Sequence, residues 1–489
     1  MNGLTDIYKP SLAMLTDLYQ LTMAYGYWKE GRGNDEAVFH LFFRKPPFGS
    51  GYTLAAGLGF AVDYLQRFSF TREDQEYLGT LTGNDDKPLF EKAFLSFLGD
   101  MTLSVDVDAM PEGTVVFPQE PLLRVKGPLI QCQLLETALL NMINFQTLIA
   151  TKAARVCQAA RGEPVLEFGL RRAQGVDGSI SASRAAYIGG CAATSNVLAG
   201  QLLGIPVKGT HAHSWVMTFD SEAEAFERYA DAMPNNCVFL IDTYDTLEGV
   251  RNAIAAGTTL RSKGYEMVGV RLDSGDLAYL SIEARKLLDA AGFENAVIIA
   301  SNDLDEHIIE SLKQQDAKIA VWGVGTKLVT AYDQPSLGGV YKLSAIRRAG
   351  EGWQYRVKLS EQSIKTSTPG ILQVRRFSDG NGFVADMIYN EDAGEPRSMT
   401  IVDPLNAEHH RTINADMDHT DLLLPVLRAG HRACEAEGLP AIRDRAAEQC
   451  NRLHGSIRRF TNPHTYPCGL DADLHHLKSS MISSLRENA

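Results

Sequence analysis

The sequence predicts an α/β protein with a sheet of parallel strands. Beyond residue 160, six short apolar runs each lead into a polar or glycine-rich turn and then into a helical stretch. The runs recur at roughly 20–40 residues, close to the interval of about 30 expected for one βα unit. They are apolar along their whole length, which is typical of parallel strands whose outer face is covered by helices.

The six runs follow one another between residues 165 and 325. They are VLEFG (165–169), IPVKGT (205–210), CVFLID (237–242), EMVGVRLD (266–273), AVIIASND (296–303) and KIAVWGVG (318–325). The spacing favours a (β/α) barrel, for which about 250 residues is typical. An open, doubly wound sheet fits the same spacing nearly as well, so the pattern alone leaves both architectures open.

The chain on either side of these runs has a different pattern. Strand-like runs at 37–45, 114–118 and 121–128 are mixed with amphipathic segments, which indicates an α+β domain. Residues 132–160 have the apolar spacing of one long helix, which we expect to end near Gly162.

Beyond residue 350, strand alternation is followed by a charged segment, 421–437, which we expect to be helical. The predicted division is therefore an N-terminal α+β domain (1–130), an α/β barrel domain (131–350) and a C-terminal segment (351–489) that packs back on both.

Composition limits the class of protein. The 489 residues carry a formal net charge of −13 and are 45% hydrophobic, as in a soluble globular chain that does not bind nucleic acid through a spread basic surface. The seven cysteines are scattered and include no C-x-x-C pair. The most apolar helical segment, 132–150, is interrupted by polar residues, and the first residues, MNGLTDIYKPSLAML, lack a basic region followed by a long apolar stretch. We expect a cytoplasmic protein with reduced, mostly buried thiols and no membrane partner.

Polar residues follow the runs at the points where strands should end. These stretches are FGLRR, GTHAH, DTYD, RLDSGD, SND and GVGTK, in chain order. Because the carboxyl ends of parallel strands carry the active site in barrels and open α/β sheets, we expect these stretches to form one polar mouth.

GTHAHSW places His211 and His213 one residue apart. Alternate residues of an extended strand end point the same way, so the pair is a candidate zinc site, yet no other strand end supplies a histidine. The other interpretations are that both are core or rim histidines, or that one of them performs covalent chemistry.

Three more stretches suit an anionic, phosphorylated substrate. RLDSGD (271–276) suits a ribose diol, Mg²⁺ or an imidazole, although an N-cap turn has the same composition. GVGTK (323–327) offers unobstructed backbone N–H groups for phosphate oxygens. FGLRR (168–172) offers a ring for stacking and guanidiniums for a carboxylate, or a surface salt-bridge face.

Taken together, TDLYQLTMAYGYW (16–28), EFGLRRAQGVDG (167–178), GTHAHSW, DTYDT, RLDSGD, SNDL and GVGTKL closely resemble the nicotinate phosphoribosyltransferase family. The resemblance covers most of the first 330 residues. It implies an irregular barrel, an N-terminal domain to which the C-terminal segment returns, and a homodimer with an active site shared across subunits. It also implies the first step of NAD salvage, in which nicotinate and phosphoribosyl pyrophosphate (PRPP) give nicotinate mononucleotide and pyrophosphate, with Mg²⁺ as cofactor and ATP as co-substrate.

The resemblance also implies roles for individual residues. His213 would be the phosphohistidine, and His211 a rim or neighbouring residue. The pyridine ring would lie between Phe168 and Tyr19, with Tyr19 supplied by the partner subunit, and Arg171 would bind the carboxylate of nicotinate or a phosphate of PRPP. Arg271 and Asp273 would face the ribose and pyrophosphate, and Gly323 and Gly325 the 5′-phosphate. The remaining expected substrate contacts are Thr210, Ser274, Asp276, Asn302, Asp303 and Thr326.

No resident metal site in the protein is expected from the resemblance, since the paired cysteines of some bacterial relatives are missing from this tail. Three alternatives remain at this stage. They are a nicotinamide phosphoribosyltransferase, a catalytically silent scaffold and a metal-dependent barrel hydrolase that uses His211 and His213.

Overall fold

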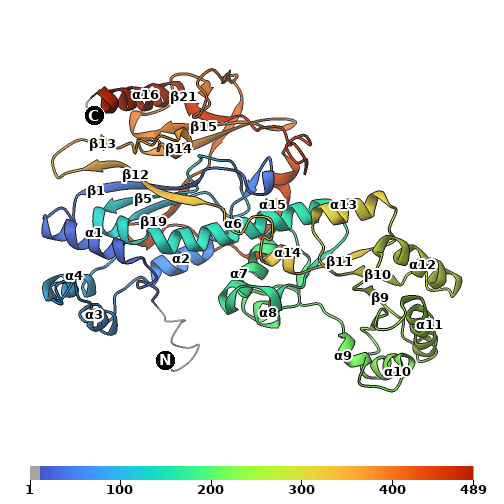
Figure 1. Cartoon of the computed structure of the whole chain (residues 1–489). Coiled ribbons are helices and arrows are strands. Elements are labelled where there is room, and N and C mark those ends of the chain that lie inside the picture. The colour runs from blue at the N-terminus through green and yellow to red at the C-terminus, as the bar shows by residue number, and fades with distance from the viewer. Residues whose placement is uncertain (1–10, 488–489) are drawn as a thin grey trace. The chain divides into compact units, whose positions relative to one another are not determined.

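The computed structural model describes residues 11–487 and divides into two compact units. One unit contains residues 148–335, and the other combines residues 1–147 with 336–489 (Figure 1). Helix α6 (Glu136–Ala159) runs from one into the other. The α/β prediction is confirmed, and each unit is described separately below.

The unit of residues 148–335 contains a six-stranded sheet in which every pairing is parallel. The order is β7 (Ala193–Thr194), β6 (Val165–Glu167), β11 (Val321–Val324), β10 (Val297–Ala300), β9 (Gly269–Leu272) and β8 (Val238–Leu240). Five of the six apolar runs therefore form strands, as predicted.

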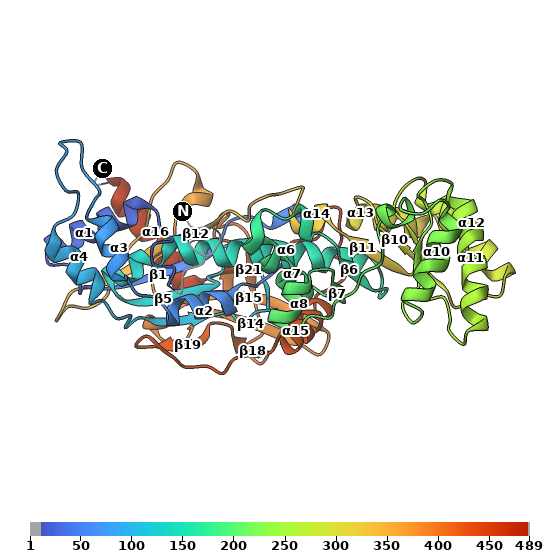
Figure 2. The ribbon, with the colours of Figure 1, turned by 90° about the horizontal axis from the view of Figure 1, so that it is seen from below.

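Helices connect these strands. Figure 1 shows α10, α11 and α12 grouped beside β9 and β10, and Figure 2 shows the same helices beside β10. The helices of this unit are α7 (Gly175–Ile188), α8 (Val197–Leu203), α9 (His213–Val216), α10 (Glu222–Ala232), α11 (Thr246–Ser262), α12 (Leu277–Ala290), α13 (Glu306–Gln314) and α14 (Thr326–Val329). Three of them begin with an aspartate side chain that accepts a hydrogen bond from the first turn, at Asp245, Asp276 and Asp305.

The run IPVKGT (205–210) was predicted to be a strand, and this prediction is wrong. It forms only an isolated parallel bridge between Val207 and Thr194 of β7. A few residues further on, the imidazole of His211 accepts a hydrogen bond from the backbone N–H of Leu240 in β8, at 3.2 Å. Residues 207–211, which we call the seam, therefore contact both edge strands of the sheet, β7 through backbone and β8 through a side chain. The edge strands β7 and β8 do not pair with each other within the described residues.

The other unit contains two larger sheets. One is a seven-stranded sheet in the order β13-β12-β1-β5-β3-β19-β20, and the other is a six-stranded sheet in the order β17-β16-β21-β15-β14-β18. The strands of the first are β1 (Glu36–Phe43), β3 (Asp106–Ala109), β5 (Leu123–Pro128), β12 (Gly339–Arg347), β13 (Gln354–Tyr355), β19 (Leu424–Arg428) and β20 (His431–Arg432). Because β1 pairs with β12 and β3 with β19, both ends of the chain share this sheet, which confirms that the C-terminal segment returns to the N-terminal domain.

The second sheet is formed by the C-terminal segment. Its strands are β14 (Leu372–Asp379), β15 (Gly382–Asn390), β16 (Thr400–Val402), β17 (His410–Thr412), β18 (Asp418–Asp421) and β21 (Cys468–Asp471). The remaining elements of this unit are β2 (Thr53–Leu54), β4 (Val115–Val116), α1 (Leu18–Lys29), α2 (Leu58–Gln66), α3 (Arg72–Leu78), α4 (Lys92–Gly99), α5 (Leu129–Leu134), α15 (Leu439–Asn451) and α16 (Ala472–Glu487). In Figure 1, α16 lies beside β21, and it packs across the three neighbouring strands β16, β21 and β15.

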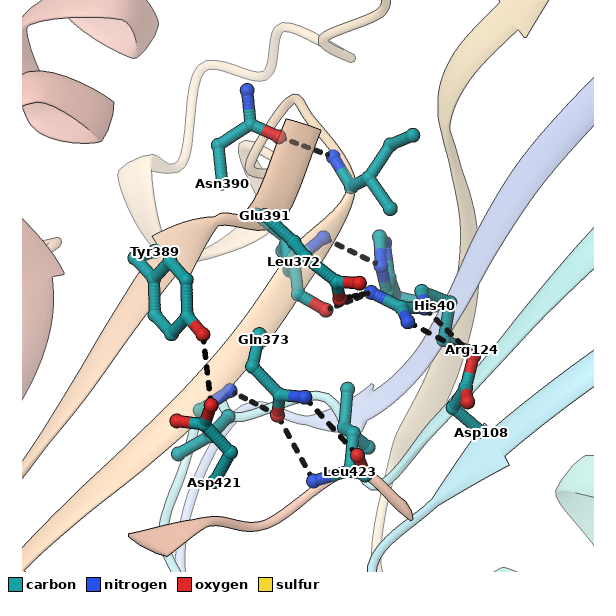
Figure 3. A network of polar contacts seen from close by, with 12 residues as sticks. His40, Asp108, Arg124, Leu372, Gln373, Tyr389, Asn390, Glu391, Asp421 and Leu423 are labelled. Carbon is teal, nitrogen blue, oxygen red and sulfur yellow. Dashed lines mark hydrogen bonds and ion pairs between the residues drawn. The ribbon is translucent and has the colours of Figure 1, made fainter. Parts of the chain in front are cut away.

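Buried polar contacts connect the two sheets within this unit (Figure 3). Arg124 of β5 bonds to Asp108 of β3 at 2.9 Å and to Glu391, which follows β15, at 2.6 Å. His40 of β1 accepts the N–H of Leu372 of β14 at 3.1 Å. Burial, with Arg124 nearby, holds the pKa of His40 well below its ordinary value, so this imidazole is a neutral acceptor.

The segment 421–437 was predicted to be helical, and it is not. Leu424, Val426 and Leu427 lie in β19, which pairs with β3, and the helix α15 begins only at Leu439 with Pro440 in its first turn. A turn at Ala429 and Gly430, both with positive φ, separates β19 from β20. A Cβ on Gly430 would lie 1.9 Å from the carbonyl oxygen of Leu103, so the turn requires glycine.

Among the described residues, no helix is long and apolar enough to cross a membrane. None of the seven cysteines, all within the described residues, forms a disulfide: Cys132, Cys191 and Cys237 are buried, three are half-buried, and Cys434 is exposed.

Candidate active site

A pocket of about 450 Å³ opens at the carboxyl ends of the parallel strands. Segments that follow five of the six strands line it, together with the stretch from Gly209 to Ala212. The lining residues are Phe168, Leu170, Arg171, Arg172, Ser195, Gly209, Thr210, His211, Ala212, Arg271, Asp273, Ser301, Asn302, Asp303, Gly323, Gly325 and Thr326. The predicted polar mouth therefore exists, and its side chains include three guanidiniums and two carboxylates.

The loop after β6 is held by Glu167, whose side chain is buried. Its carboxylate accepts hydrogen bonds from Thr194 at 2.6 Å, from Ser183 at 2.8 Å and from the backbone N–H of Gly169. The next residue, Phe168, places its ring against the backbone of β11, where a Cβ on Gly323 would lie 2.8 Å from the ring. Gly323 is therefore needed for the ring to occupy this position.

The loop after β10 has an unusual backbone. Asn302 and Asp303 both have positive φ, 101° and 28°. Asparagine and aspartate tolerate this region better than other residues with a side chain, but consecutive residues there are strained, and such strain is concentrated at functional sites. Both residues are exposed and line the pocket.

Arg271 supplies a desolvated positive charge. One of its terminal nitrogens donates to the carbonyl oxygen of His211 at 3.1 Å, while its buried Nε has no partner within the described residues. Burial lowers the pKa of Arg271, with Arg171 adding to the effect, although the guanidinium remains charged. A buried guanidinium with an unused N–H favours an anionic ligand.

Asp273 is held in place from two sides. Its carboxylate accepts from the hydroxyl of Ser301, and its backbone N–H donates to Asp242 at 2.8 Å. Ser274 donates its hydroxyl to the same oxygen of Asp242 at 2.6 Å, and the other oxygen of Asp242 is buried without a partner within the described residues. Asp242 therefore orders the RLDSGD turn from the end of β8.

His213 lies at the first position of α9 and is half-exposed. Its Nδ1 is 3.2 Å from the hydroxyl of Thr243, and its Nε2 is 3.8 Å from Asp273 Oδ2. The carboxylate of Asp273 thus faces the imidazole as well as the pocket.

His211 has a different role from His213. It is buried, its Nε2 accepts from Leu240, and its Nδ1 lies 3.4 Å from the carbonyl oxygen of Ala212. Burial lowers the pKa of His211 to about 4, so the ring is neutral. With both ring nitrogens engaged, His211 is not available to form the H-x-H metal pair, and no cluster of three or more metal-ligating side chains is found among the described residues.

The structure brings ten of the predicted site residues to the pocket. They are Phe168, Arg171, Thr210, Arg271, Asp273, Asn302, Asp303, Gly323, Gly325 and Thr326. His213 lies 3.8 Å from the lining residue Asp273, and Ser274 bonds to Asp242, which does not line the pocket. Asp276 caps α12 by accepting the N–H of Tyr279 at 3.1 Å, and Tyr19 lies half-exposed on α1 in the other compact unit, so their contacts with substrate stay predictions.

Sequence reasoning missed Asp242, Thr243, Ser195 and Ser301. Asp242 and Thr243 belong to DTYD, and Ser301 to SND, both of which were recognised as strand ends. The available signal was their position, since the first polar residues after parallel strands gather at the same edge of the sheet.

A parallel sheet with a glycine-lined pocket rich in arginine at its carboxyl ends is typical of α/β enzymes that bind phosphorylated substrates. Residues 14–144, 164–378 and 373–478 match, in order, the nicotinate phosphoribosyltransferase (NAPRTase) N-terminal domain, the NAPRTase family and the nicotinate phosphoribosyltransferase C-terminal domain. A nicotinate phosphoribosyltransferase of Bacillus subtilis is 41% identical over 490 residues, with 98% of each chain covered. The human one is 38% identical over 530 residues, with 96% of each covered.

Solved structures agree with these sequence matches. The crystal structure of human nicotinic acid phosphoribosyltransferase superimposes with a TM-score of 0.84 at 35% identity, covering 95% of this chain and 99% of that chain. The chain therefore belongs to the nicotinate phosphoribosyltransferase family and is an enzyme.

Proposed function

We propose that the protein joins nicotinate to the ribose of PRPP, forming nicotinate mononucleotide and pyrophosphate, as the first step of NAD salvage from nicotinate. The observation that carries this proposal is the composition of the 450 Å³ pocket at the carboxyl ends of the parallel strands. It combines an aromatic ring (Phe168), a cluster of guanidiniums and a backbone free of side chains at Gly323 and Gly325. These features suit, respectively, a flat pyridine ring, carboxylate or phosphate groups, and a 5′-phosphate.

In the proposed reaction, the pyridine nitrogen attacks ribose C1 as the C1–O bond to pyrophosphate breaks. The nitrogen lone pair is already nucleophilic, so no strong base is needed, and catalysis consists of positioning and electrostatic stabilisation. Asp273 would face the positive charge that develops on the ribose, and Arg271 the negative charge on the departing pyrophosphate. Arg171 would bind the carboxylate of nicotinate, with Thr210, Asn302, Asp303 and Thr326 as further contacts.

The donor set fits a Mg²⁺ ion that arrives with the substrate. Mg²⁺ is commonly bound by one or two carboxylates together with substrate phosphates, and the pocket offers two carboxylates, Asp273 and Asp303. When bound, the ion would neutralise charge on the pyrophosphate. A dedicated site of three or more ligating side chains is not present within residues 11–487.

We further propose that ATP phosphorylates His213. The attack on the γ-phosphoryl requires a ring nitrogen with a free lone pair, and the contacts of His213 with Thr243 and Asp273 would orient the ring for it. ADP would leave, and the added phosphoryl group would place about two negative charges at the edge of the pocket. These charges would reorganise the arginine and loop contacts around PRPP, which would link ATP hydrolysis to PRPP affinity.

The proposal includes a homodimer in which the partner subunit's Tyr19 completes the base site opposite Phe168. The half-exposed side chain of Tyr19 and the exposed apolar residues Val197, Leu198 and Leu202 on α8 are compatible with burial against a second chain.

The test is product detection with radiolabelled nicotinate and PRPP, with and without ATP. We expect labelled nicotinate mononucleotide, formed faster with ATP, and no product from labelled nicotinamide. Turnover of nicotinamide instead would support the alternative specificity, and absence of any product with either base would contradict the proposal.

A further inference from the structure

An ion pair outside the pocket connects the loops that follow β10 and β11. Lys327 Nζ lies 2.6 Å from Asp305 Oδ2, and the two side chains are 22% and 9% exposed. Neither residue lines the pocket, whereas Asn302, Asp303, Gly325 and Thr326, which precede them in sequence, do. The pair thus lies next in sequence to the two pocket-lining loops that we assign to the phosphoribosyl group, and outside the pocket.

Each partner is anchored in its own element. The second oxygen of Asp305 accepts the N–H of Ile308 at 2.8 Å, so Asp305 is the N-cap of α13 as well as the partner of Lys327. Lys327 is the second residue of the short helix α14, directly after Thr326. Each loop therefore ends at a residue whose side chain is fixed by the other loop.

A cluster of buried ion pairs connects helix α6 to α13 and to the residues that follow α14. Glu306, the first residue of α13, is fully buried and bonds to Lys152 and Arg155 of α6, each at 2.7 Å. Lys152 also bonds to Asp333, which follows α14, at 2.7 Å. Helix α6 thus contacts both the start of α13 and the residues after α14. The Lys327–Asp305 pair adds a direct contact between α13 and α14, so each of the two loops is held at its far end.

The strained backbone at Asn302 and Asp303 requires contacts that hold the loop in place. Asn302 and Asp303 have positive φ, and this conformation persists only when the surrounding structure fixes it. Asp305 is two residues further on, so releasing it from Lys327 would free one end of the strained turn.

We propose that Lys327 and Asp305 form a positioning pair that holds the pocket-lining loops 302–304 and 325–326 in the geometry required by PRPP, without contacting the substrate. This inference rests on the proposed function for its kinetic readout. It also makes a structural prediction that is independent of turnover.

The kinetic test compares Lys327→Met, Asp305→Asn and the double variant. Asparagine caps helices as well as aspartate does, so Asp305→Asn removes the charge and keeps the N-cap. We expect each single variant to raise the KM for PRPP about tenfold with kcat within about threefold, because misplaced loops weaken binding of the group that they contact. The double variant should be no worse than either single one, and Lys327→Arg should restore the wild-type KM.

A direct phosphate contact by Lys327 would give a different result. Asp305→Asn would then leave the KM for PRPP unchanged, and that outcome overturns the proposal. The matched control removes the ion pair between Lys313, at the other end of α13, and Glu163. Lys313→Met should change neither parameter.

Amide hydrogen exchange of residues 301–304 and 323–328 tests the positioning role without catalysis. Exchange should increase in Lys327→Met and Asp305→Asn but not in Lys313→Met, and equal exchange in all three would overturn the inference. If the wild-type protein makes no nicotinate mononucleotide, the proposed function fails while this measurement still decides the positioning role.

Discussion

His211 should make the stability of the seam, residues 207–211, depend on pH. Its imidazole accepts the Leu240 N–H while buried, and its pKa is lowered from 6.5 to about 4. At a pH between these two pKa values, His211 is protonated in the unfolded chain but neutral in the folded chain. The contribution of His211 to stability is fully present above about pH 6.5 and is lost as the pH falls towards 4.

The size of this loss follows from the two pKa values. At about 1.4 kcal/mol for each pH unit between them, the folded state loses about 3 kcal/mol, as an order of magnitude. His40 shifts in the same direction in the other compact unit, so the whole protein loses more than this. A measurement confined to the seam is needed to isolate His211.

The assay is hydrogen exchange of the amides of β8, corrected for the intrinsic effect of pH, between pH 7 and 4.5. Protection should fall with pH in the wild-type protein. In His211→Gln, the amide oxygen of the new side chain can accept the Leu240 N–H without titrating, so protection should depend much less on pH. His40→Gln is the matched control and should leave the β8 profile unchanged. Equal pH dependence in the wild-type and His211→Gln proteins would refute the reasoning.

Three further predictions concern the pocket. His213→Ala should abolish ATP hydrolysis and the gain in PRPP affinity with ATP while leaving some transferase activity; full ATP coupling in this variant would show that another group accepts the phosphoryl. Arg171→Ala should raise the KM for nicotinate at least about tenfold, since it removes a charge-assisted bond, and an unchanged KM would place the carboxylate elsewhere. Gly323→Ala puts a Cβ 2.8 Å from the ring of Phe168, which should cost about 1–3 kcal/mol of nicotinate affinity by calorimetry, whereas wild-type affinity would mean that the ring does not contact the base.

The sequence predicted those parts of the fold that depend on local pattern. Runs such as VLEFG and AVIIASND became strands because apolar residues of strand length must be covered on both faces of a parallel sheet. The segments 205–210 and 421–437 were mispredicted because tertiary contacts decide them. Val207 forms only a bridge, and β19 is a strand through its pairing with β3.

The site shows the same division between local pattern and tertiary contact. Glycines and charged residues at strand ends were recognisable, since parallel strands bring their carboxyl ends together. Asp242 was not chosen, because its partners Asp273 and Ser274 lie about 30 residues away in sequence. Likewise, GVGTK contains Lys327, but only the structure reveals that its ammonium faces Asp305 and not the pocket.

The two histidines of GTHAHSW have different roles although only Ala212 lies between them. On an extended strand, side chains two residues apart would point the same way. The extended chain ends at Ala212, the N-cap of α9, and His213 is already helical. The first imidazole therefore stays in the seam as a neutral acceptor for β8, while the second faces Asp273 at the edge of the pocket. Because His211 and His213 flank Ala212, the N-cap of α9, the contact with β8 and the placement of the second imidazole depend on the same short segment.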